Sequence, residues 1–410
     1  MTFGQYIRKR MHEFDWFYLL FALLLATAGL IAIYSIEFQQ EAERTYFGRQ
    51  VVWVVFGSIL MVATYLIPRK LVHNLAYIAY GLGVLSLGAL LVLGRGASVS
   101  RWINFGSLGV QPSEFMKVLL LVSLARYFAD HKRQLTSVKE LMTPAAMTLL
   151  PMLLVLMQPD LGTALVYIAT LIVVIFWAGI RPLYFFLLLA PMISMLASFQ
   201  TLSFFIWMAI LLVMLWLGRM PLWTSIINFT INIMLGGVTN LLWGLLKPYQ
   251  QQRILSMFNA EADPLGAGYQ LSQSLTAFGS GGPFGKGFGQ GTQTHLKFLP
   301  EQHTDFIMTV IGEEFGFLGV TLVIAVFYLL FARLVNQAYS SKYRFDSVVL
   351  IGVTGILVFH SFVNLGMIVG IMPVTGIPLP FISYGGSFMF TSMILLGLAA
   401  NMSTSYRAAG

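Results

Sequence analysis

Long apolar runs repeat along almost the whole chain. A transmembrane helix needs about 20 consecutive apolar residues, and the first run, Phe14–Ile36, is long enough to be one. Over the 410 residues, 58% are hydrophobic and only 10% are charged. A soluble domain carries about 25% charged residues, so this chain would expose apolar surface that it cannot bury in water. We therefore predict a membrane protein with many spans.

The sequence predicts twelve spans in a single all-α membrane domain, a polytopic transmembrane helix bundle covering residues 1–410. Runs as short as about 17 residues are tolerated as spans. The first run is too long for a signal-peptide core and lacks a small-residue cleavage site, so we expect it to be retained. The predicted spans are Phe14–Ile36, Val51–Ile67, Leu75–Gly94, Pro112–Phe128, Pro144–Met157, Gly162–Ala178, Leu183–Phe199, Leu202–Leu217, Ser225–Leu246, Phe306–Phe331, Ser347–Ile371 and Ser387–Met402.

Basic residues in the loops indicate the orientation of the chain. With the N-terminus inside, the cytoplasmic segments hold fifteen Lys and Arg and the outer segments hold eight, while Lys117 lies within a span. Cytoplasmic loops carry an excess of Lys and Arg, so an even number of spans with both termini in the cytoplasm is favoured. No basic stripe with interleaved aromatic residues is present, which argues against nucleic-acid binding. The absence of cysteine excludes disulfides and thiol catalysis.

Two segments interrupt the pattern of spans, and both are expected on the outer face. Lys247–Asp305 is a long polar loop, and Pro373–Gly386 (PVTGIPLPFISYGG) is rich in proline and glycine. Irregular backbone at membrane depth is tolerated only against protein or a water-filled cavity. Long ordered loops are often functional. We predict that the chemistry of the protein takes place at this face.

Asp305, at the end of the polar loop, is the first candidate for chemistry. One interpretation is that Thr304 or Asp305 caps the apolar helix that follows. The other is that the Asp305 carboxylate lies at the membrane surface and takes a proton from an attacking hydroxyl. Glu301 and His303 are near enough in the sequence to assist it. Spacing alone leaves both interpretations open.

Lys117 places a charge inside a predicted span, which costs about 2.5–3.5 kcal/mol on insertion scales. Lys117 shares a helix face with Glu114, three residues earlier. The two side chains either form an ion pair with no further role, or Lys117 reaches a lipid diphosphate. Arg101, in the preceding outer loop, is placed to join it. Asp160, in the motif QPDLGT, is most simply the N-cap of the next span.

A glycine-rich stretch, FGSGGPFGKGFGQG, lies in the polar loop. It is not a nucleotide-binding loop, because Gly287 follows Lys286 where that motif requires Ser or Thr. A flexible loop whose amides and Lys286 contact phosphate or sugar remains an option. In the next span, Gly312, Gly316 and Gly319 share a face and predict close packing of another helix.

No metal-binding motif stands out. His295 and His303 do not match the spacing of zinc sites. We predict no firm cofactor. A divalent cation such as Mg²⁺, held by carboxylates and a substrate diphosphate, is the remaining option, because Mg²⁺ often binds in that way.

Seven motifs, in this order, resemble one protein family. They are QPSEFMK, QPDLGT, DPLGAGYQ, GKGFGQGTQ, FLPEQHTDF, GEEFG and PLPFISYGGS, which span about Arg101 to Ser387. Together they resemble the SEDS proteins (shape, elongation, division and sporulation). The motif sequence GTQ…FLPEQHTDF is closer to that of the RodA-like elongation members than to that of the FtsW-like division members.

The resemblance implies an activity. SEDS proteins polymerise peptidoglycan glycan strands from lipid II, an undecaprenyl-diphosphate-linked precursor, in the bacterial cytoplasmic membrane. Their partner is a class B penicillin-binding protein, which crosslinks the strands. Asp305 falls on the essential aspartate of the family, Glu114 and Lys117 on a functional pair, and Asp160 on the aspartate of the QPD motif. The family usually has ten spans, so residues 202–246 are expected to be an inserted two-helix hairpin.

The resulting hypothesis is an inverting glycosyltransferase for cell elongation and shape. Asp305 acts as general base on the acceptor hydroxyl, and Lys117, with Arg101, offsets charge on the departing diphosphate. An ordinary aspartate pKa of about 3.9 already suffices for a base at neutral pH. The alternatives are a lipid II transporter, a polymerase or ligase of another undecaprenyl-diphosphate-linked glycan, and a non-enzymatic scaffold. The outer clustering of the candidates argues against a transporter, whose site lies near the midplane.

Overall fold

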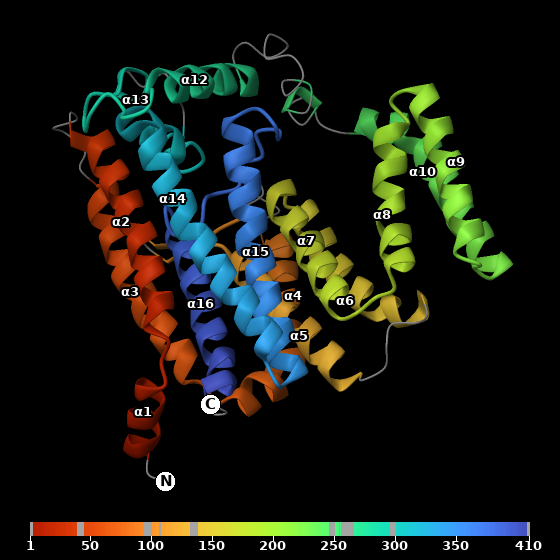
Figure 1. Cartoon of the computed structure of the whole chain (residues 1–410), viewed down its shortest axis with the longest axis horizontal. Coiled ribbons are helices and arrows are strands. Elements are labelled where there is room, and N and C mark those ends of the chain that lie inside the picture. The colour runs from red at the N-terminus through yellow and green to blue at the C-terminus, as the bar shows by residue number, and fades with distance from the viewer. Residues whose placement is uncertain are drawn as a thin grey trace.

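The computed structural model describes residues 3–38, 45–93, 101–105, 108–131, 138–245, 251–253, 255, 266–295 and 301–407. Within these ranges the chain is almost entirely helical (Figure 1). The described residues also contain a short antiparallel hairpin, β1 (Ile103–Phe105) and β2 (Leu108–Val110), in which Ile103 pairs with Val110. The helices are α1 (Phe3–His12), α2 (Trp16–Phe38), α3 (Tyr46–Leu66), α4 (Arg69–Leu93), α5 (Pro112–Asp130), α6 (Val138–Leu156), α7 (Leu161–Trp177), α8 (Pro182–Ala197), α9 (Thr201–Leu217), α10 (Leu222–Leu245), α12 (Ala267–Ser280), α13 (Thr292–His295), α14 (Ile307–Ser340), α15 (Arg344–Ile368) and α16 (Gly386–Arg407).

The predicted spans are confirmed as helices, since each of the twelve overlaps one. Among the described residues, seven helices are long and apolar enough to cross a membrane, and α6 to α9 are shorter but also apolar. The protein is therefore a multi-pass membrane protein. Helix α1 and the end of α16 lie at the same end of the bundle (Figure 1), as an even number of spans requires. The sequence analysis did not predict α1, which is short and polar.

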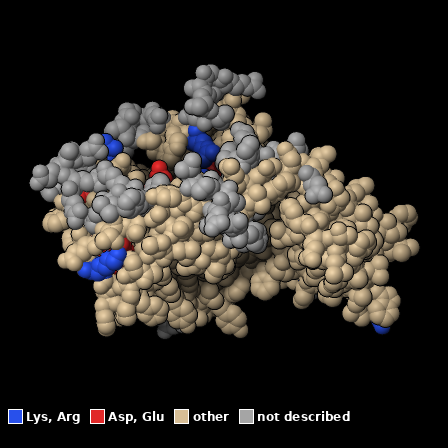
Figure 2. Space-filling view, turned by 90° about the horizontal axis from the view of Figure 1, so that it is seen from above, with Lys and Arg blue, Asp and Glu red and all other residues tan. Residues whose placement is uncertain are grey.

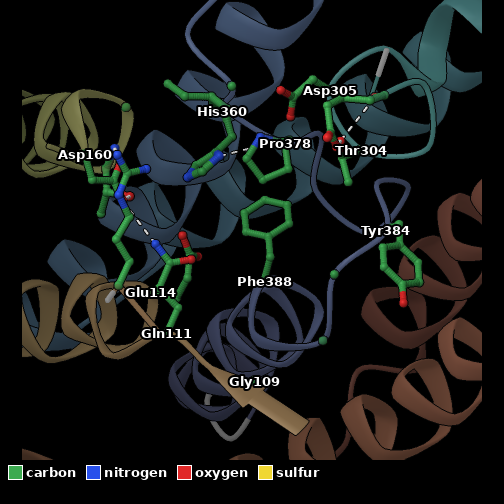
Figure 3. A pocket seen from close by; sticks show the side chains of 18 of the residues that line it. Gly109, Gln111, Glu114, Asp160, Thr304, Asp305, His360, Pro378, Tyr384 and Phe388 are labelled. Carbon is green, nitrogen blue, oxygen red and sulfur yellow. Dashed lines mark hydrogen bonds between the residues drawn. The ribbon is translucent and has the colours of Figure 1, made fainter. Parts of the chain in front are cut away.

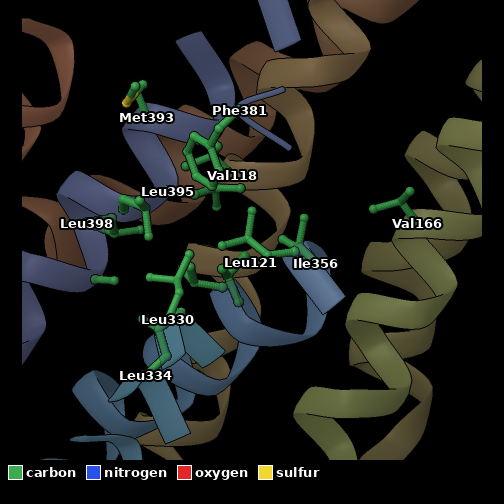
Figure 4. Packing of buried hydrophobic residues seen from close by; sticks show 14 of the residues in the cluster. Val118, Leu121, Val166, Leu330, Leu334, Ile356, Phe381, Met393, Leu395 and Leu398 are labelled. Atoms are coloured by element: carbon green, nitrogen blue, oxygen red, sulfur yellow. The ribbon is translucent and has the colours of Figure 1, made fainter. Parts of the chain in front are cut away.

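The centre of the bundle is formed by α5, α14, α15 and α16. Helix α15 packs against α5, α7, α14 and α16, and most of its side chains are buried. Figure 4 shows Val118 and Leu121 of α5, Leu330 of α14, Ile356 of α15 and Leu395 of α16 in this core. Lipid tails are as apolar as these side chains, so close packing rather than transfer from water favours this arrangement. The rigid core fixes the ends of α5, α14 and α15, where the candidate residues lie.

Helices α8, α9 and α10 form a separate unit beside the main bundle (Figure 1). The sequence predicts two helices over residues 202–246, and α9 and α10 are found there. The unit has its own apolar cluster, formed by Leu187, Ala190, Met208, Leu211 and Leu215. Hydrogen bonds inside it join Ser194 Oγ to Asn232 (2.6 Å) and Trp207 Nε1 to Ser194 Oγ (2.8 Å). Such bonds join helices that are surrounded by lipid.

The predicted outer loop is partly helical. Helices α12 and α13 lie across the ends of the bundle helices, next to the start of α14 (Figure 1). The stretches 246–250, 256–265 and 296–300 lie outside the described residues. Helix α14 is interrupted at Gly316, which has φ +65° and ψ −161°. A Cβ there would lie 2.3 Å from the backbone nitrogen of Gly285.

The predicted helix-on-helix role of the three α14 glycines is therefore wrong at Gly316. This residue admits the backbone of the glycine-rich loop, whereas Gly312 faces Phe278 of α12. At Gly319, a Cβ would meet Phe315 of the same helix. Glycine is required at Gly316 because its positive φ and the close approach both exclude a side chain.

Candidate active site

A cavity of about 550 Å³ opens at the end of the bundle opposite to α1. It lies between the start of α5, the start of α7, the residues before α14, and the segment between α15 and α16. Seen from above (Figure 2), the described surface is largely uncharged, and acidic and basic side chains gather beside a hollow. The predicted site residues that line the cavity are Arg101, Glu114, Asp160, Glu301, His303 and Asp305. Residues predicted from distant motifs therefore meet in one place.

Asp305 lies immediately before α14 and opens onto the cavity (Figure 3). The N-cap of α14 is Phe306, with no side-chain capping hydrogen bond. The interpretation that Thr304 or Asp305 caps this helix is therefore wrong. Thr304 Oγ1 instead donates to the backbone oxygen and the carboxylate of Glu301, at 3.1 Å in each case. The Asp305 side chain is left facing the cavity.

The environment of Asp305 makes it a stronger base than an exposed aspartate. Burial and, to a smaller extent, the negative charge of Glu301 raise its pKa to about 6, while Arg253 opposes the rise. The role of a base at neutral pH does not require this rise, but the rise makes Asp305 a better proton acceptor. In the described residues, no hydrogen bond to the Asp305 carboxylate is found. Its oxygens remain available to a hydroxyl group of a substrate.

Two other carboxylates that line the cavity, those of Asp160 and Glu114, already interact with protein side chains or amides. Asp160 is the N-cap of α7, as predicted, and its side chain accepts from Thr163 N at 3.1 Å and Thr163 Oγ1 at 2.9 Å. Gln111 Nε2 also donates to it at 3.0 Å. Glu114 pairs with Lys117. Asp305 is consequently the cavity carboxylate best placed to accept a proton.

Pro112 begins α5, and the first two turns of this helix hold an ion pair. Nζ of Lys117 lies 2.7 Å from Oε2 of Glu114, and both side chains are buried. The predicted pairing is confirmed. The ring of Phe388 lies 5.3 Å from Lys117 Nζ, close enough for a cation–π contact. Glu114 and Phe388 line the cavity and Lys117 lies directly behind them.

The segment between α15 and α16 encloses Asp305. Ser383 Oγ donates to the backbone oxygen of Thr304 at 2.6 Å, and Tyr384 N donates to that of His303 at 3.0 Å. Gly376 has φ +73°, and a Cβ there would lie 3.3 Å from Asp305 Oδ2. This irregular backbone packs against protein and also lines the cavity, which are the two settings that the sequence allowed. The segment supplies much of the burial that raises the pKa of Asp305.

Arg101 lines the cavity but does not join Lys117 in one cluster. Its guanidinium donates to the backbone oxygen of Gln158 at 2.8 Å and also to that of Pro159. These bonds fix the side chain to the joint between α6 and α7. Arg101 therefore presents a second positive charge to the cavity from another wall.

An aromatic wall, which the sequence analysis missed, lies on the side of the cavity near α3. His303 stacks on Tyr46 with ring centroids 4.6 Å apart, and Tyr384 meets Tyr46 edge-on at 4.9 Å. Trp53 lies 4.8 Å from Tyr384. Burial lowers the pKa of His303, which keeps its ring neutral at pH 7. The sequence indicates His303 as a candidate and Tyr384 only through its proline- and glycine-rich segment.

Lys286 does not line the cavity. Its Nζ donates to Glu313 Oε1 at 2.8 Å and to Thr292 Oγ1 at 2.7 Å. The backbone amides of Lys286 and Gly287 donate to the carbonyls of Glu313 and Glu314, each at 3.0 Å. The glycine-rich loop thus covers the break in α14. These amides and Lys286 make internal contacts, and the contact with phosphate or sugar stays a prediction.

His360 of α15 is the second element that the sequence analysis missed. Its Nε2 lies 3.1 Å from Lys117 Nζ, and its Nδ1 lies 3.2 Å from the backbone oxygen of Pro378. Within the described ranges, no group of three or more His, Asp or Glu side chains is arranged to hold a metal ion. The described site combines the Asp305 carboxylate, a buried ammonium group beside the cavity, the guanidinium of Arg101 and an aromatic wall.

Fold and site together define a multi-pass membrane protein with a polar cavity at one end of its helix bundle. Comparison with known proteins gives its family. The model of the FtsW/RodA/SpoVE family, described as cell cycle protein, matches residues 15–205 and 200–408. The chain belongs to this family, as the resemblance of its motifs predicted.

Individual relatives match this chain over almost its full length. The chain is 33% identical to peptidoglycan glycosyltransferase RodA of Treponema pallidum, covering 95% of this chain and 97% of that protein. It is 31% identical to a probable peptidoglycan glycosyltransferase FtsW of Trichlorobacter lovleyi, covering 98% and 96%. A solved structure described as "Structural coordination of polymerization and crosslinking by a peptidoglycan synthase complex" matches with a TM-score of 0.70 and 28% identity, covering 95% and 97%.

Proposed function

We propose that this protein is a peptidoglycan glycosyltransferase that polymerises lipid II into glycan strands. The observation that carries the proposal is the shared cavity, which is lined by the Asp305 carboxylate and by Glu114, the ion-pair partner of the buried Lys117. The names of its relatives support the reaction class. The excess of basic residues in the predicted inner loops supports an outer position for the cavity in the bacterial cytoplasmic membrane, with both termini in the cytoplasm.

The proposed reaction is an inverting displacement at the anomeric carbon of the donor sugar. The donor is a growing strand attached to undecaprenyl diphosphate, and the acceptor is the 4-hydroxyl of a second lipid II. The hydroxyl oxygen attacks the anomeric carbon while its proton passes to Asp305. The bond between that carbon and the diphosphate oxygen breaks, and the electron pair leaves with the diphosphate. The new glycosidic bond has the opposite configuration.

The charges of the site suit both halves of this step. With a pKa of about 6, Asp305 remains about nine-tenths ionised at pH 7 and binds a proton more tightly than an ordinary aspartate. Lys117 and Arg101 offset the negative charge that grows on the diphosphate. Asp160 and Gln111 line the same cavity, where they are hydrogen-bonded to each other. Holding both substrates in line is itself a large share of such catalysis.

The aromatic wall of Tyr46, Trp53, His303 and Tyr384 suits a sugar ring. Aromatic faces are apolar, while the hydroxyl groups and ring nitrogens beside them offer hydrogen bonds. Glu301 and His303 flank Asp305 and complete this side of the cavity. We propose that the acceptor sugar lies against this wall, next to Asp305, and the diphosphate lies toward Lys117.

We further propose a class B penicillin-binding protein as partner and a role in elongation and cell shape. The partner is supported by the likeness to a solved peptidoglycan synthase complex, in which polymerisation is coordinated with crosslinking. The elongation role is supported by the motif sequence GTQ…FLPEQHTDF, which resembles that of the elongation members. We propose that a divalent cation such as Mg²⁺, where the reaction uses one, is held chiefly by the diphosphate, because the described residues form no metal cluster.

The test is a polymerisation assay with purified protein and lipid II, with and without the partner, in which products are resolved by length. Glycan strands made by the wild-type protein are the expected result. A parallel assay follows labelled lipid II across vesicles that contain the protein. Transbilayer movement without any polymer would overturn the proposal in favour of a transporter. Polymer formed only from another undecaprenyl-diphosphate-linked sugar would show that this sugar, and not lipid II, is the substrate.

A further inference from the structure

His360 links Lys117 to the segment between α15 and α16. Its side chain is 2% exposed. Nε2 lies 3.1 Å from Nζ of Lys117, and Nδ1 lies 3.2 Å from the carbonyl oxygen of Pro378 (Figure 3). Lys117 and His360 are separated by 243 positions in the sequence. The contact therefore joins α5 to α15 at the cavity.

The partners of His360 fix which ring nitrogen carries the hydrogen. A carbonyl oxygen only accepts, so Nδ1 must donate to Pro378. A lysine ammonium only donates, so Nε2 must accept from Lys117. The imidazole is therefore neutral with its hydrogen on Nδ1. Lys117 therefore lies between the Glu114 carboxylate and the accepting nitrogen of His360, which fix the position of its ammonium group.

Asn364 makes the equivalent link on the other side of the site. It lies four residues after His360, so both side chains project from one face of α15. Asn364 Nδ2 donates to the backbone oxygen of Asp305 at 2.9 Å and to that of Ile377 at 2.9 Å. Pro378 and Ile377 are consecutive in the enclosing segment. One face of α15 therefore contacts Lys117 through His360 and the backbone of Asp305 through Asn364. The same two side chains also bind the consecutive carbonyl groups of Ile377 and Pro378.

We propose that His360 and Asn364 form a positioning pair that sets the separation between the Lys117 ammonium and the Asp305 carboxylate. The inference rests on the proposed function, since it assigns the pair to the alignment of leaving group and base. Neither residue transfers a proton or touches the reacting atoms. Because the core fixes α15, the pair holds both ends of the site to one rigid element.

The expected cost of losing this alignment is large. A misplacement of about 1 Å between reacting groups lowers rates by roughly 100-fold. His360→Leu removes both hydrogen bonds of the ring and replaces the ring with an apolar side chain of similar size. Lys117 then keeps Glu114 but loses the second contact that fixes its ammonium group. We expect kcat to fall by about 10–100-fold, while KM for lipid II changes by less than about threefold.

His360→Gln is the conservative variant. A glutamine has one oxygen that accepts from Lys117 and one amide group that donates to Pro378. We expect it to restore kcat to within about threefold of the wild-type value. His360→Asn has the same groups on a shorter side chain that cannot reach both partners, so it should behave like His360→Leu. It serves as the second variant if His360→Leu does not fold.

Thr354→Val is the matched control. Thr354 is also buried in α15, and its hydroxyl donates only to Leu350 of its own helix, at 2.8 Å. The experiment measures kcat, KM and the thermal transition of each variant in detergent with the full-length protein. The proposal predicts a loss of kcat in His360→Leu and His360→Asn, and near wild-type kcat in His360→Gln and Thr354→Val.

Two outcomes would overturn the proposal. One is wild-type kcat in folded His360→Leu or His360→Asn. The other is a kcat in His360→Gln as low as in His360→Leu, which would show that the two hydrogen bonds do not matter. An inactive wild-type protein in the same assay would instead defeat the proposed function, so the two failures are distinguishable.

Discussion

Oε2 of Glu114 lies 2.7 Å from Nζ of Lys117, with both side chains buried, at a cavity that Asp305 also lines. The pair supplies a fixed positive charge inside the membrane protein without leaving either ion uncompensated. A buried ion pair contributes little to stability compared with apolar residues of similar size, but losing one partner is costly. Its retention is therefore best explained by the site it serves.

The first prediction separates stability from activity at this pair. Glu114→Gln or Lys117→Met alone should destabilise the protein by about 3–5 kcal/mol, because each leaves a buried charge without its partner. The double variant Glu114→Gln/Lys117→Met should regain most of that stability. All three should polymerise lipid II at least about 100-fold more slowly. Thermal transitions and polymerisation rates check this, and a double variant with normal activity would contradict the role of Lys117.

The second prediction concerns pH. Because the pKa of Asp305 is raised to about 6, protonation removes the base as the pH falls through 6, and activity should fall with it. The negative charge of Glu301 raises that pKa and Arg253 lowers it. Glu301→Gln should therefore move the acid limb of the rate profile to lower pH, and Arg253→Gln should move it to higher pH. Shifts in the same direction in both variants would contradict this assignment.

The third prediction concerns the glycine beside the carboxylate. Gly376→Ala places a methyl group 3.3 Å from Asp305 Oδ2 at a φ of +73°. Gly370→Ala is the matched control, because its φ is +75° but its new methyl group meets the side chain of Leu271. Each should cost about 1–2 kcal/mol of stability. Only Gly376→Ala should lower kcat per folded molecule, and equal loss of kcat in both variants would refute the argument.

The sequence predicts those parts of the site that depend on local spacing. Glu114 and Lys117 lie three residues apart on one helix, so their pairing follows from helix geometry. Asp160 precedes an apolar run, which is the pattern of an N-cap. The spans follow in the same way from run length.

The rest depends on contacts between distant segments. His360 reaches Lys117 across 243 positions, and nothing near His360 in the sequence indicates that contact. The pKa of Asp305 depends on burial and on the charges of Glu301 and Arg253, so its rise could not be predicted from the sequence. The contact of Lys286 with Glu313 could not be predicted either, because the two residues lie on different segments.

The fourth prediction concerns Lys286. Lys286→Met removes a hydrogen bond from the buried Glu313 carboxylate, which still accepts from the amides of Thr292, Gln293 and Thr294. The variant should lose about 1–3 kcal/mol of stability. Its KM for lipid II should stay within about twofold of the wild-type value, because Lys286 lies away from the cavity.

Arg101→Met is the comparison for Lys286→Met. Arg101 lines the cavity, so its loss should raise KM for lipid II by roughly tenfold, as expected when a charge-assisted contact of about 1.5 kcal/mol is lost. A raised KM for lipid II in Lys286→Met, at unchanged stability, would show that Lys286 contacts the substrate.

The most direct test of the account is the polymerisation of lipid II by Asp305→Asn. Asparagine keeps the size of the side chain but cannot accept the proton of the acceptor hydroxyl. We predict a folded protein with a wild-type thermal transition that still binds lipid II, with polymerisation reduced by about 100-fold or more. Strands formed by Asp305→Asn at the wild-type rate and length would contradict the assignment of Asp305 as the base.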